Sequence, residues 1–200
     1  MIPATLRREL KRRRRQLSPD YRAQANARLA ARIQQLPAFR RARHIAGYIP
    51  CQGEADPLPA MLAAQRQCKQ TFLPVLHPFL PRKLIFAPWT ATTRFQSNRY
   101  NIPEPDMPLW QSIPPARLDL VLTPLLGFDA QANRLGMGGG YYDRTFVFRR
   151  YYRYWPRPYL LGVAFSEQQC DELPVNPWDI PLDAVITPDA LFLPDSATCT

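Results

Sequence analysis

Short apolar runs alternate along this chain with stretches of helical composition, and this alternation is what most constrains the fold. The clearest run is LDLVLTP (118–124), in which leucine and valine lead directly to a proline. Strands that alternate with helices are typical of α/β proteins, whose parallel sheets are buried on both faces. We therefore expect a three-layer, Rossmann-like α/β fold with a mostly parallel sheet and helices on both faces. The other expected strands are HIAGYIP (44–50), QTFLPV (70–75), KLIFAP (83–88), YLLGVAF (159–165) and DAVIT (183–187).

The N-terminal segment, from about residue 4 to residue 35, is predicted to be helical and basic. Residues 4–17 are rich in Arg, Lys, Leu and Glu, which favour helices. Ser18 is a typical N-cap residue and Pro19 is favoured at a first helical position, so a second helix should begin there and end near Gln35. The later expected helices cover 57–68 and 141–152.

Length and composition limit the kind of protein. Two hundred residues, 46% of them hydrophobic, suit one domain spanning 1–200 with a real core. The four cysteines form no C-x-x-C pair and the chain has two histidines, so we expect neither a zinc site nor a disulfide framework. No apolar run approaches the roughly 20 residues of a membrane span, and the N-terminus lacks a signal-peptide core. We expect a monomeric cytoplasmic protein with no membrane partner.

The net charge of +10 is concentrated near the N-terminus. Residues 1–43 carry 13 of the 26 basic residues and two acidic ones, most densely in LRRELKRRRRQL (6–17). Such a run could bind nucleic acid, cover the solvated face of a helix, or attract an anionic ligand. Because consecutive helical residues are rotated by about 100°, most of Arg12–Arg15 should face solvent. Interleaved basic and aromatic residues in RRYYRYWPRPY (149–159) also suit nucleic-acid stacking, or a helix end packed on the sheet.

The loop RLGMGGGYYDR (134–144) contains four of the eight glycines of the chain. It follows an expected strand and precedes an expected helix, where open α/β sheets usually bind ligands. Glycines allow successive backbone N–H groups to surround an anion, and Arg134 and Arg144 add positive charge. A nucleotide polyphosphate suits this arrangement, with Asp143 available for its Mg²⁺. The loop lacks the G-K-[ST] of a P-loop and the third glycine of the dinucleotide fingerprint, so the glycines alone could also form a flexible surface turn.

The longer stretch LDLVLTPLLGFDAQANRLGMGGGYYDR (118–144) closely resembles the signature of the 5-formyltetrahydrofolate cyclo-ligase family. The resemblance continues through most of the chain. It implies an ATP-dependent enzyme that converts 5-formyltetrahydrofolate to 5,10-methenyltetrahydrofolate with Mg²⁺, and it ranks nucleic-acid binding well below that activity. The other similar segments are LRRELKRRRRQLSP (6–19), YIPCQGEAD (48–56), FLPV (72–75), NIPEP (101–105) and LGVAFSEQQCDELPVNPWDIPLDAVIT (161–187).

The resemblance also implies roles for individual residues. It assigns catalysis to Arg134 and Tyr141, and Mg²⁺ binding to Asp143 and Asp179. The implied ATP contacts are Arg7, Arg134, Leu135, Gly136, Met137, Gly138, Gly139, Gly140, Tyr141 and Tyr142. The implied folate contacts are Ile49, Glu54, Tyr100, Met137, Gly138, Gly139, Gly140 and Tyr141.

Several of these residues also have simpler structural interpretations. Asp143 could cap its helix or form an ion pair within it, and Asp179 and Glu54 could be ordinary turn residues. Ile49 could belong to the core, and Tyr100 could be a surface residue.

The chain also departs from the family pattern in the glycine loop and just before it. Several relatives carry Arg and Lys where this chain has Met137 and Gly139, so other cations must meet the phosphate charge. Many have a glycine where this chain has Ala132, and we expect Asn133 to adopt the left-handed conformation instead. Asp129 in the same turn is expected to be structural, through an Asx-type turn.

Overall fold

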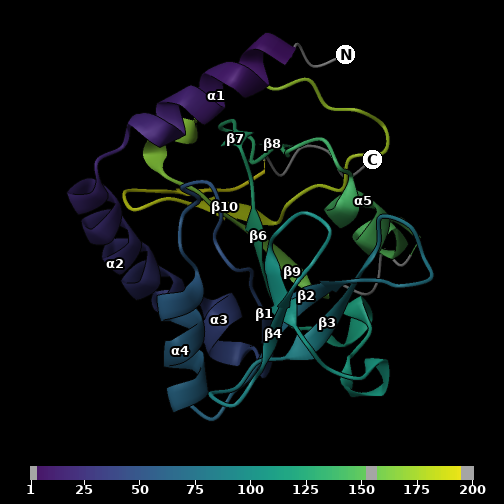
Figure 1. Cartoon of the computed structure of the whole chain (residues 1–200). Helices are drawn as coiled ribbons and strands as arrows, with labels where there is room; N and C mark the ends of the chain where they lie inside the picture. The colour runs from purple at the N-terminus through teal and green to yellow at the C-terminus, as the bar shows by residue number, and fades with distance from the viewer. Residues whose placement is uncertain (1–3, 152–156, 195–200) are drawn as a thin grey trace.

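The computed structural model describes residues 4–151 and 157–194, and it contains a central sheet with helices on both sides (Figure 1). The strands of this sheet are β1 (His44–Ala46), β2 (Gln70–Leu76), β3 (Leu84–Pro88), β6 (Leu120–Pro124), β9 (Tyr159–Val163), β10 (Ala184–Ile186) and β11 (Leu191–Phe192). Their order is β11-β10-β9-β6-β1-β2-β3. The five central strands are parallel, whereas β3 and β11 run antiparallel to their neighbours. The expected mostly parallel α/β fold is confirmed.

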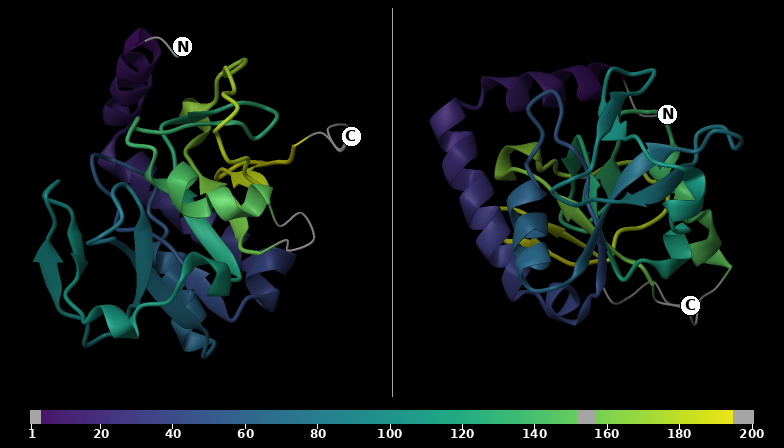
Figure 2. Two further views of the ribbon diagram at one scale, coloured as in Figure 1. Left: turned by 90° about the vertical axis from the view of Figure 1, so that its right-hand side faces the viewer. Right: turned by 60° about the horizontal axis from the view of Figure 1, so that its bottom comes forward.

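Side chains from each central strand alternate between two cores. In β6, Leu120 and Leu122 join the cluster that contains Leu29, whereas Val121 joins the cluster that contains Phe146. Because helices cover both faces of the sheet, the sequences of its central strands are continuous apolar runs. The helices on the first face are α2 (Pro19–Gln35), α3 (Pro37–Arg41) and α4 (Leu58–Arg66); on the second face lie α5 (Tyr141–Phe146) and the 3-10 helix η3 (Val147–Arg150) (Figure 2).

Helix α1 (Ala4–Gln16) lies apart from these layers, across the end of the molecule that carries the glycine loop (Figure 1). Its Leu10 is fully buried and packs with Leu126, Leu135 and Leu173 in a third, smaller cluster. Beneath it runs a short hairpin of β7 (Gly127–Phe128) and β8 (Arg134–Leu135). The position of α1 is therefore set by packing on the loops around the site and not by the sheet.

The expected start of α2 is confirmed in detail. The Ser18 side chain accepts a hydrogen bond from the Tyr21 amide at 3.2 Å, and Pro19 occupies the first helical position. The helix ends at Gln35, as expected. The short helix α3, which follows it, was not predicted from the sequence. Among the described residues, the structure has no helix with the length and apolar character needed to span a bilayer.

Two expected elements are shorter in the structure, and several short elements were not expected. The strand expected at 44–50 covers only His44–Ala46; the Gly47 amide still donates to the Phe72 carbonyl at 3.1 Å, and the chain then leaves the sheet and forms part of a pocket wall. Helix α5 ends at Phe146 and tightens into η3; residue 152, the expected end, lies outside the described residues. The hairpin of β4 (Phe95–Ser97) and β5 (Pro103–Pro105) was not expected, and the exposed β4 has no apolar alternation. The remaining 3-10 helices are η1 (Leu109–Gln111), η2 (Pro115–Arg117) and η4 (Ser166–Gln168).

Candidate functional site

A pocket of about 890 Å³ lies at the carboxyl ends of β1, β2 and β6. Its sheet-side wall includes Ile49, Leu76 and Pro124, which follow or end these strands. The chain moves from β1 to β2 on one side and later returns to β6 on the other. Ligands of open α/β sheets usually bind at such a reversal of strand order, outside the carboxyl ends of the strands. The glycine loop and the segment around Tyr100 complete the pocket.

The glycine loop joins β8 to α5 and is held by two arginines from different helices. Gly138 has φ of +98° and Gly140 has φ of +65°, conformations that residues with a Cβ rarely adopt. Arg7 of α1 donates from Nε to the Gly136 carbonyl at 3.3 Å, and Arg144 donates from Nη1 to the Gly139 carbonyl at 3.2 Å. The loop therefore has a defined backbone shape with positive charge on two sides, as a phosphate-binding loop requires.

Arg134 and Asp143 form an ion pair at the junction of the loop and α5. The guanidinium of Arg134 also lies 5.9 Å from the centre of the Tyr142 ring, and its side chain is 7% exposed. Within the described part of the chain, the buried Nη1 of Arg134 has no hydrogen-bond partner. A buried guanidinium nitrogen without an acceptor is costly, so this end of the pocket favours an anionic ligand.

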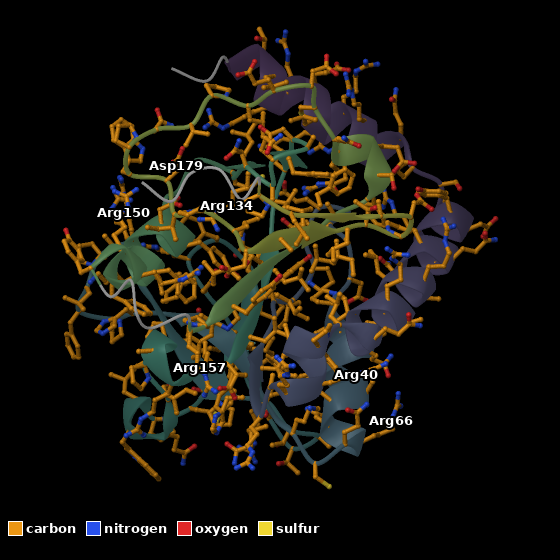
Figure 3. All side chains as sticks on the ribbon, turned by 180° about the vertical axis from the view of Figure 1, so that it is seen from behind. Arg40, Arg66, Arg134, Arg150, Arg157 and Asp179 are labelled. Carbon is orange, nitrogen blue, oxygen red and sulfur yellow. The ribbon has the colours of Figure 1, made fainter. Side chains whose placement is uncertain are left out.

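Asp179 reaches the same end of the pocket from the C-terminal part of the chain. Its Oδ2 accepts hydrogen bonds from the backbone and side-chain nitrogens of Asn176 at 2.8 and 3.0 Å. The next residue, Ile180, donates its amide to Oδ1 of Asp143 at 3.1 Å. Arg150 donates to the Asp179 carbonyl at 2.9 Å, and Figure 3 shows Arg134, Arg150 and Asp179 in the same region of the molecule.

These two carboxylates suit Mg²⁺ in its usual role beside phosphates. The described hydrogen bonds use Oδ1 of Asp143 and Oδ2 of Asp179, which leaves the other oxygen of each without a hydrogen bond from the described residues. No three His, Cys, Asp or Glu residues cluster as a metal site anywhere in ranges 4–151 and 157–194. Mg²⁺ commonly takes one or two carboxylates and completes its shell with water and substrate phosphates, so this donor set fits it.

Tyr141 begins α5, directly after the glycine loop, and its hydroxyl contacts two residues near β4. Its hydroxyl accepts a hydrogen bond from Arg99 and lies 2.8 Å from the Tyr100 hydroxyl. The two rings meet edge to face, with centroids 6.0 Å apart. This bond to Tyr141 is the main reason that the pKa of Tyr100 is lowered, whereas burial raises the pKa of Tyr141. Tyr100 is thus tied to the site although its side chain is half-exposed.

Glu54 lies on a tight turn that follows β1. Gln52 and Gly53, at the centre of this turn, both have positive φ, and the Glu54 amide donates to the Cys51 carbonyl at 3.0 Å. The Glu54 carboxylate is nearly buried and accepts from the Cys51 amide at 3.1 Å. Burial is the largest influence on its pKa, which is raised. The glutamate is both a turn residue and a pocket residue, so the two interpretations are not exclusive.

The structure brings all of the sequence-predicted site residues to one pocket. Their roles toward a ligand remain predictions. The fifteen lining positions are Arg7, Ile49, Glu54, Tyr100, Arg134, Leu135, Gly136, Met137, Gly138, Gly139, Gly140, Tyr141, Tyr142, Asp143 and Asp179.

Sequence reasoning did not single out several cations in or beside this pocket. Arg82 and Lys83 line it, and Arg99 contacts Tyr141; Arg150, which also lines it, was noted only within the basic–aromatic stretch 149–159. These residues come from loops or helix ends without a recognisable pattern, so no local signal identified them.

Two sequence expectations about turns have different outcomes. Asp129 is confirmed as structural: it is 2% exposed and accepts from the amides of Gln131, Asn133 and Leu173. The expectation that Asn133 takes the left-handed conformation is wrong, because Ala132 itself has φ of +59°. The bonds made by Asp129 fix the turn around Ala132, and they offset the cost of that conformation.

Most arginines of the run 12–15 in α1 are exposed and one is buried, as helical geometry predicts. Arg12 and Arg13 are exposed and form ion pairs with Glu9 at 2.9 and 3.0 Å, and Arg15 is exposed. Arg14 is the exception, with 1% of its side chain exposed and its guanidinium 3.6 Å from Glu54. The centre of the basic–aromatic stretch 149–159, for which nucleic-acid stacking was one of two interpretations, lies outside the described residues at 152–156.

Comparisons with known proteins agree with this geometry. Residues 3–188 match the model of the 5-formyltetrahydrofolate cyclo-ligase family. The chain is 37% identical to 5-formyltetrahydrofolate cyclo-ligase of Escherichia coli K12 over 183 residues, which cover 92% of this chain and 98% of that protein. It is 34% identical to the Haemophilus influenzae protein of the same name, over 88% and 92% of the two chains. The solution structure of Aquifex aeolicus 5,10-methenyltetrahydrofolate synthetase is similar, with a TM-score of 0.81, 25% identity and coverage of 100% and 96%.

Proposed function

This chain belongs to the 5-formyltetrahydrofolate cyclo-ligase family and is an enzyme of that family, and from this premise we propose how it works. It converts 5-formyltetrahydrofolate to 5,10-methenyltetrahydrofolate and uses MgATP as co-substrate. ADP and phosphate are released with each turnover.

The formyl oxygen is a poor leaving group, so the reaction needs activation. The γ-phosphoryl group of ATP is transferred to the formyl oxygen and ADP leaves. N10 of the folate then attacks the formyl carbon, its proton is lost, and the carbon–oxygen bond breaks as phosphate departs. This sequence requires alignment of two substrates and neutralisation of phosphate charge more than a protein nucleophile.

The glycine loop end of the pocket would receive the triphosphate. The observation that best supports this is the buried Nη1 of Arg134, which has no acceptor among the described residues. Arg7 and Arg144 hold the loop at two points, the carbonyls of Gly136 and Gly139. They add positive charge that Met137 and Gly139 cannot supply. Arg134 therefore acts in catalysis by stabilising charge on the transferring phosphoryl group.

The Glu54 end of the pocket would receive the folate. A carboxylate matches the N–H donors of a pterin ring, and Ile49 offers an apolar wall beside it. Tyr141, held by Arg99 and Tyr100, lies between the loop and the aromatic side of the pocket. Its hydroxyl is available to orient the formyl group toward the phosphate.

Asp143 and Asp179 would hold Mg²⁺ with the nucleotide. When bound, the ion neutralises charge on the phosphate oxygens. Asp143 also anchors Arg134, so this carboxylate links the metal position with the arginine that faces the phosphates.

The direct test uses purified protein with 5-formyltetrahydrofolate and MgATP, following methenyl absorbance and the release of ADP. Methenyl product and ADP should appear in step, and neither should form without ATP. Product formation without ATP, or no product with it, rejects the proposal.

A further inference from the structure

A buried ion pair joins α1 to the turn that carries Glu54. Nη1 of Arg14 lies 3.6 Å from Oε1 of Glu54, and the two side chains are 1% and 8% exposed. Arg14 itself does not line the pocket, whereas Glu54 does. The arginine thus stands behind the glutamate, on the side away from the ligand.

The contact between the two side chains is electrostatic, and their surroundings are buried. Nε and Nη1 of Arg14 are buried and have no hydrogen-bond partner among the described residues. Burial of Glu54 disfavours its ionised form, and the positive charge of Arg14 opposes that effect. Removing one member of such a pair leaves the other charge buried without compensation, which is more costly than the pair is stabilising.

The spacing of residues on α1 explains why Arg14 reaches this position. Arg7, Leu10 and Arg14 are three and four residues apart and so lie on one face of the helix. Leu10 is fully buried in the small cluster under α1, and Arg7 contacts the Gly136 carbonyl. One helix face therefore touches the glycine loop at one end and Glu54 at the other.

A second arginine fixes the end of this helix. Arg22 of α2 donates from Nη2 to the Arg14 carbonyl at 2.9 Å and to the Arg15 carbonyl at 3.3 Å. A Cβ on Gly53 would lie only 3.1 Å from the same guanidinium. Arg22 thus packs between the last turn of α1 and the turn that carries Glu54, and its contacts link the two segments.

We propose that Arg14 is a positioning residue for the folate side of the site: it keeps the Glu54 carboxylate ionised and aimed into the pocket. The inference rests on the proposed folate-binding role of Glu54. It assigns to α1 a second function beyond its contact with the glycine loop.

The other groups that face Glu54 cannot replace this charge. Cys51 donates its amide and thiol to Oε2 at 3.1 and 3.5 Å, and burial raises the pKa of that thiol to about 11. Burial also raises the pKa of Tyr48 and of Tyr142 well above the usual value, so both stay neutral. Asp56, beyond Tyr48, can contribute only negative charge. Arg14 is the cation that acts directly on Glu54 within the described residues.

The test compares Arg14→Met with Arg15→Met, an exposed neighbour that serves as the control. We expect Arg14→Met to raise KM for 5-formyltetrahydrofolate by about tenfold or more, the effect of losing one charge-assisted contact, with KM for ATP changed by less than about twofold. The ionised carboxylate is the active form, so activity falls as pH drops through its pKa. Without Arg14 that pKa rises, and the acid limb of kcat/KM should move to higher pH.

A second set of variants separates positioning from simple stability. Glu54→Gln should remove the part of the acid limb that depends on Glu54. In that background, Arg14→Met should raise folate KM little further. Arg14→Lys keeps the charge and should retain more folate affinity than Arg14→Met. If Arg14→Met does not fold, Arg14→Gln and Arg14→Lys supply the same comparison of pH profiles.

Several results would overturn the inference. One is a normal folate KM with an unmoved acid limb in Arg14→Met; another is an equal rise in KM for both substrates, which would mean that α1 is only structural. The inference would also fail if Arg14→Met raised folate KM as much in the Glu54→Gln background as it does in the wild-type protein. If the wild-type protein forms no methenyl product, the proposed activity fails, and titration of the same variants with 5-formyltetrahydrofolate still decides whether Arg14 supports folate binding.

Discussion

At the scale of single residues, the site depends on charged side chains that lack some of their usual hydrogen-bond partners. Arg134 is nearly buried, yet one of its nitrogens has no acceptor in the described structure. Asp143 supplies its counter-charge and also accepts the Ile180 amide. An arginine held by a carboxylate but not saturated by it is preorganised for a second anion, because its orientation is fixed before the ligand arrives.

We expect Asp143→Asn to lower kcat by about 100-fold or more, the usual effect of removing a preorganised charge from an active site. The change keeps the shape of the side chain but removes the charge that holds Arg134 and suits Mg²⁺. Folate binding should be largely retained, because no described hydrogen bond or ion pair joins Asp143 to Glu54. Turnover measured across a range of Mg²⁺ concentrations checks this, and a near-normal rate at low Mg²⁺ would show that Asp143 is only structural.

Two glycines of the loop differ in what they tolerate. Gly138 has φ of +98°, whereas no heavy atom lies within 4 Å of a Cβ added to Gly136. Gly138→Ala should therefore disfavour the bound loop shape by about 1–2 kcal/mol and raise KM for ATP by about tenfold. Gly136→Ala adds the same methyl group without this strain and should have a smaller effect. Thermal unfolding and ATP kinetics on both variants distinguish the cases; a steep loss of stability with unchanged ATP affinity in Gly138→Ala contradicts the idea.

At the scale of elements, α1 acts as a strap across the site. Its contacts include the hydrogen bond from Arg7 to the glycine loop, the ion pair of Arg14 with Glu54, the burial of Leu10 between them, and the bonds from Arg22 to its last turn. None of these lies in the sheet, so the helix depends on a small apolar cluster for its position. The binding of both substrates should therefore respond to the packing of this one helix.

We expect Leu10→Ala to lower the free energy of unfolding by about 2–4 kcal/mol, because it leaves a cavity in a small cluster. If α1 loosens, KM should rise for both ATP and 5-formyltetrahydrofolate, in contrast to the selective effect expected for Arg14. Arg8→Ala, on the exposed side of the helix, should change stability by less than about 0.5 kcal/mol. Chemical denaturation and steady-state kinetics measure both properties.

At the scale of the whole molecule, the pocket collects residues from most of the chain. Arg7 and Asp179 are near opposite ends of the sequence, and both line it. The parallel strands supply a rigid base, and the walls come from connections at their carboxyl ends. Ligands that contact so many separate segments should stabilise the entire fold, because unfolding any one of them would release the ligand.

We therefore expect MgATP together with 5-formyltetrahydrofolate to raise Tm. At 100 times Kd, a ligand stabilises by about 2.7 kcal/mol, which for a chain of this size corresponds to a rise of about 5–10 °C. Each ligand alone should give a part of this shift, and ATP without Mg²⁺ should give less than MgATP. Differential scanning calorimetry measures the shifts, with an unrelated anion such as sulfate as the control for general charge effects.

Local patterns in the sequence were sufficient for helices α1, α2 and α4, the central strands and the glycine loop. Ser18 and Pro19 define the start of α2 through a capping bond that involves neighbouring residues alone. The run at 118–124 predicts β6 because a strand buried on both faces needs continuous apolar residues. The loop from Arg134 to Asp143 predicts an anion site because its glycines, charges and flanking elements are all adjacent in the chain.

Tertiary structure alone decided the features whose partners are distant in the chain. The spacing from Leu10 places Arg14 on the inner face of α1, but no local pattern shows that its partner is Glu54, because that depends on how α1 docks on a loop 40 residues away. The same holds for Arg99 beside Tyr141, at a separation of 42 residues. Ala132 keeps a left-handed conformation only because Asp129 receives amides from its own turn and from Leu173. Sequence thus determined the chemistry available, and packing determined which charges meet, because contact energies between distant segments depend on the folded geometry.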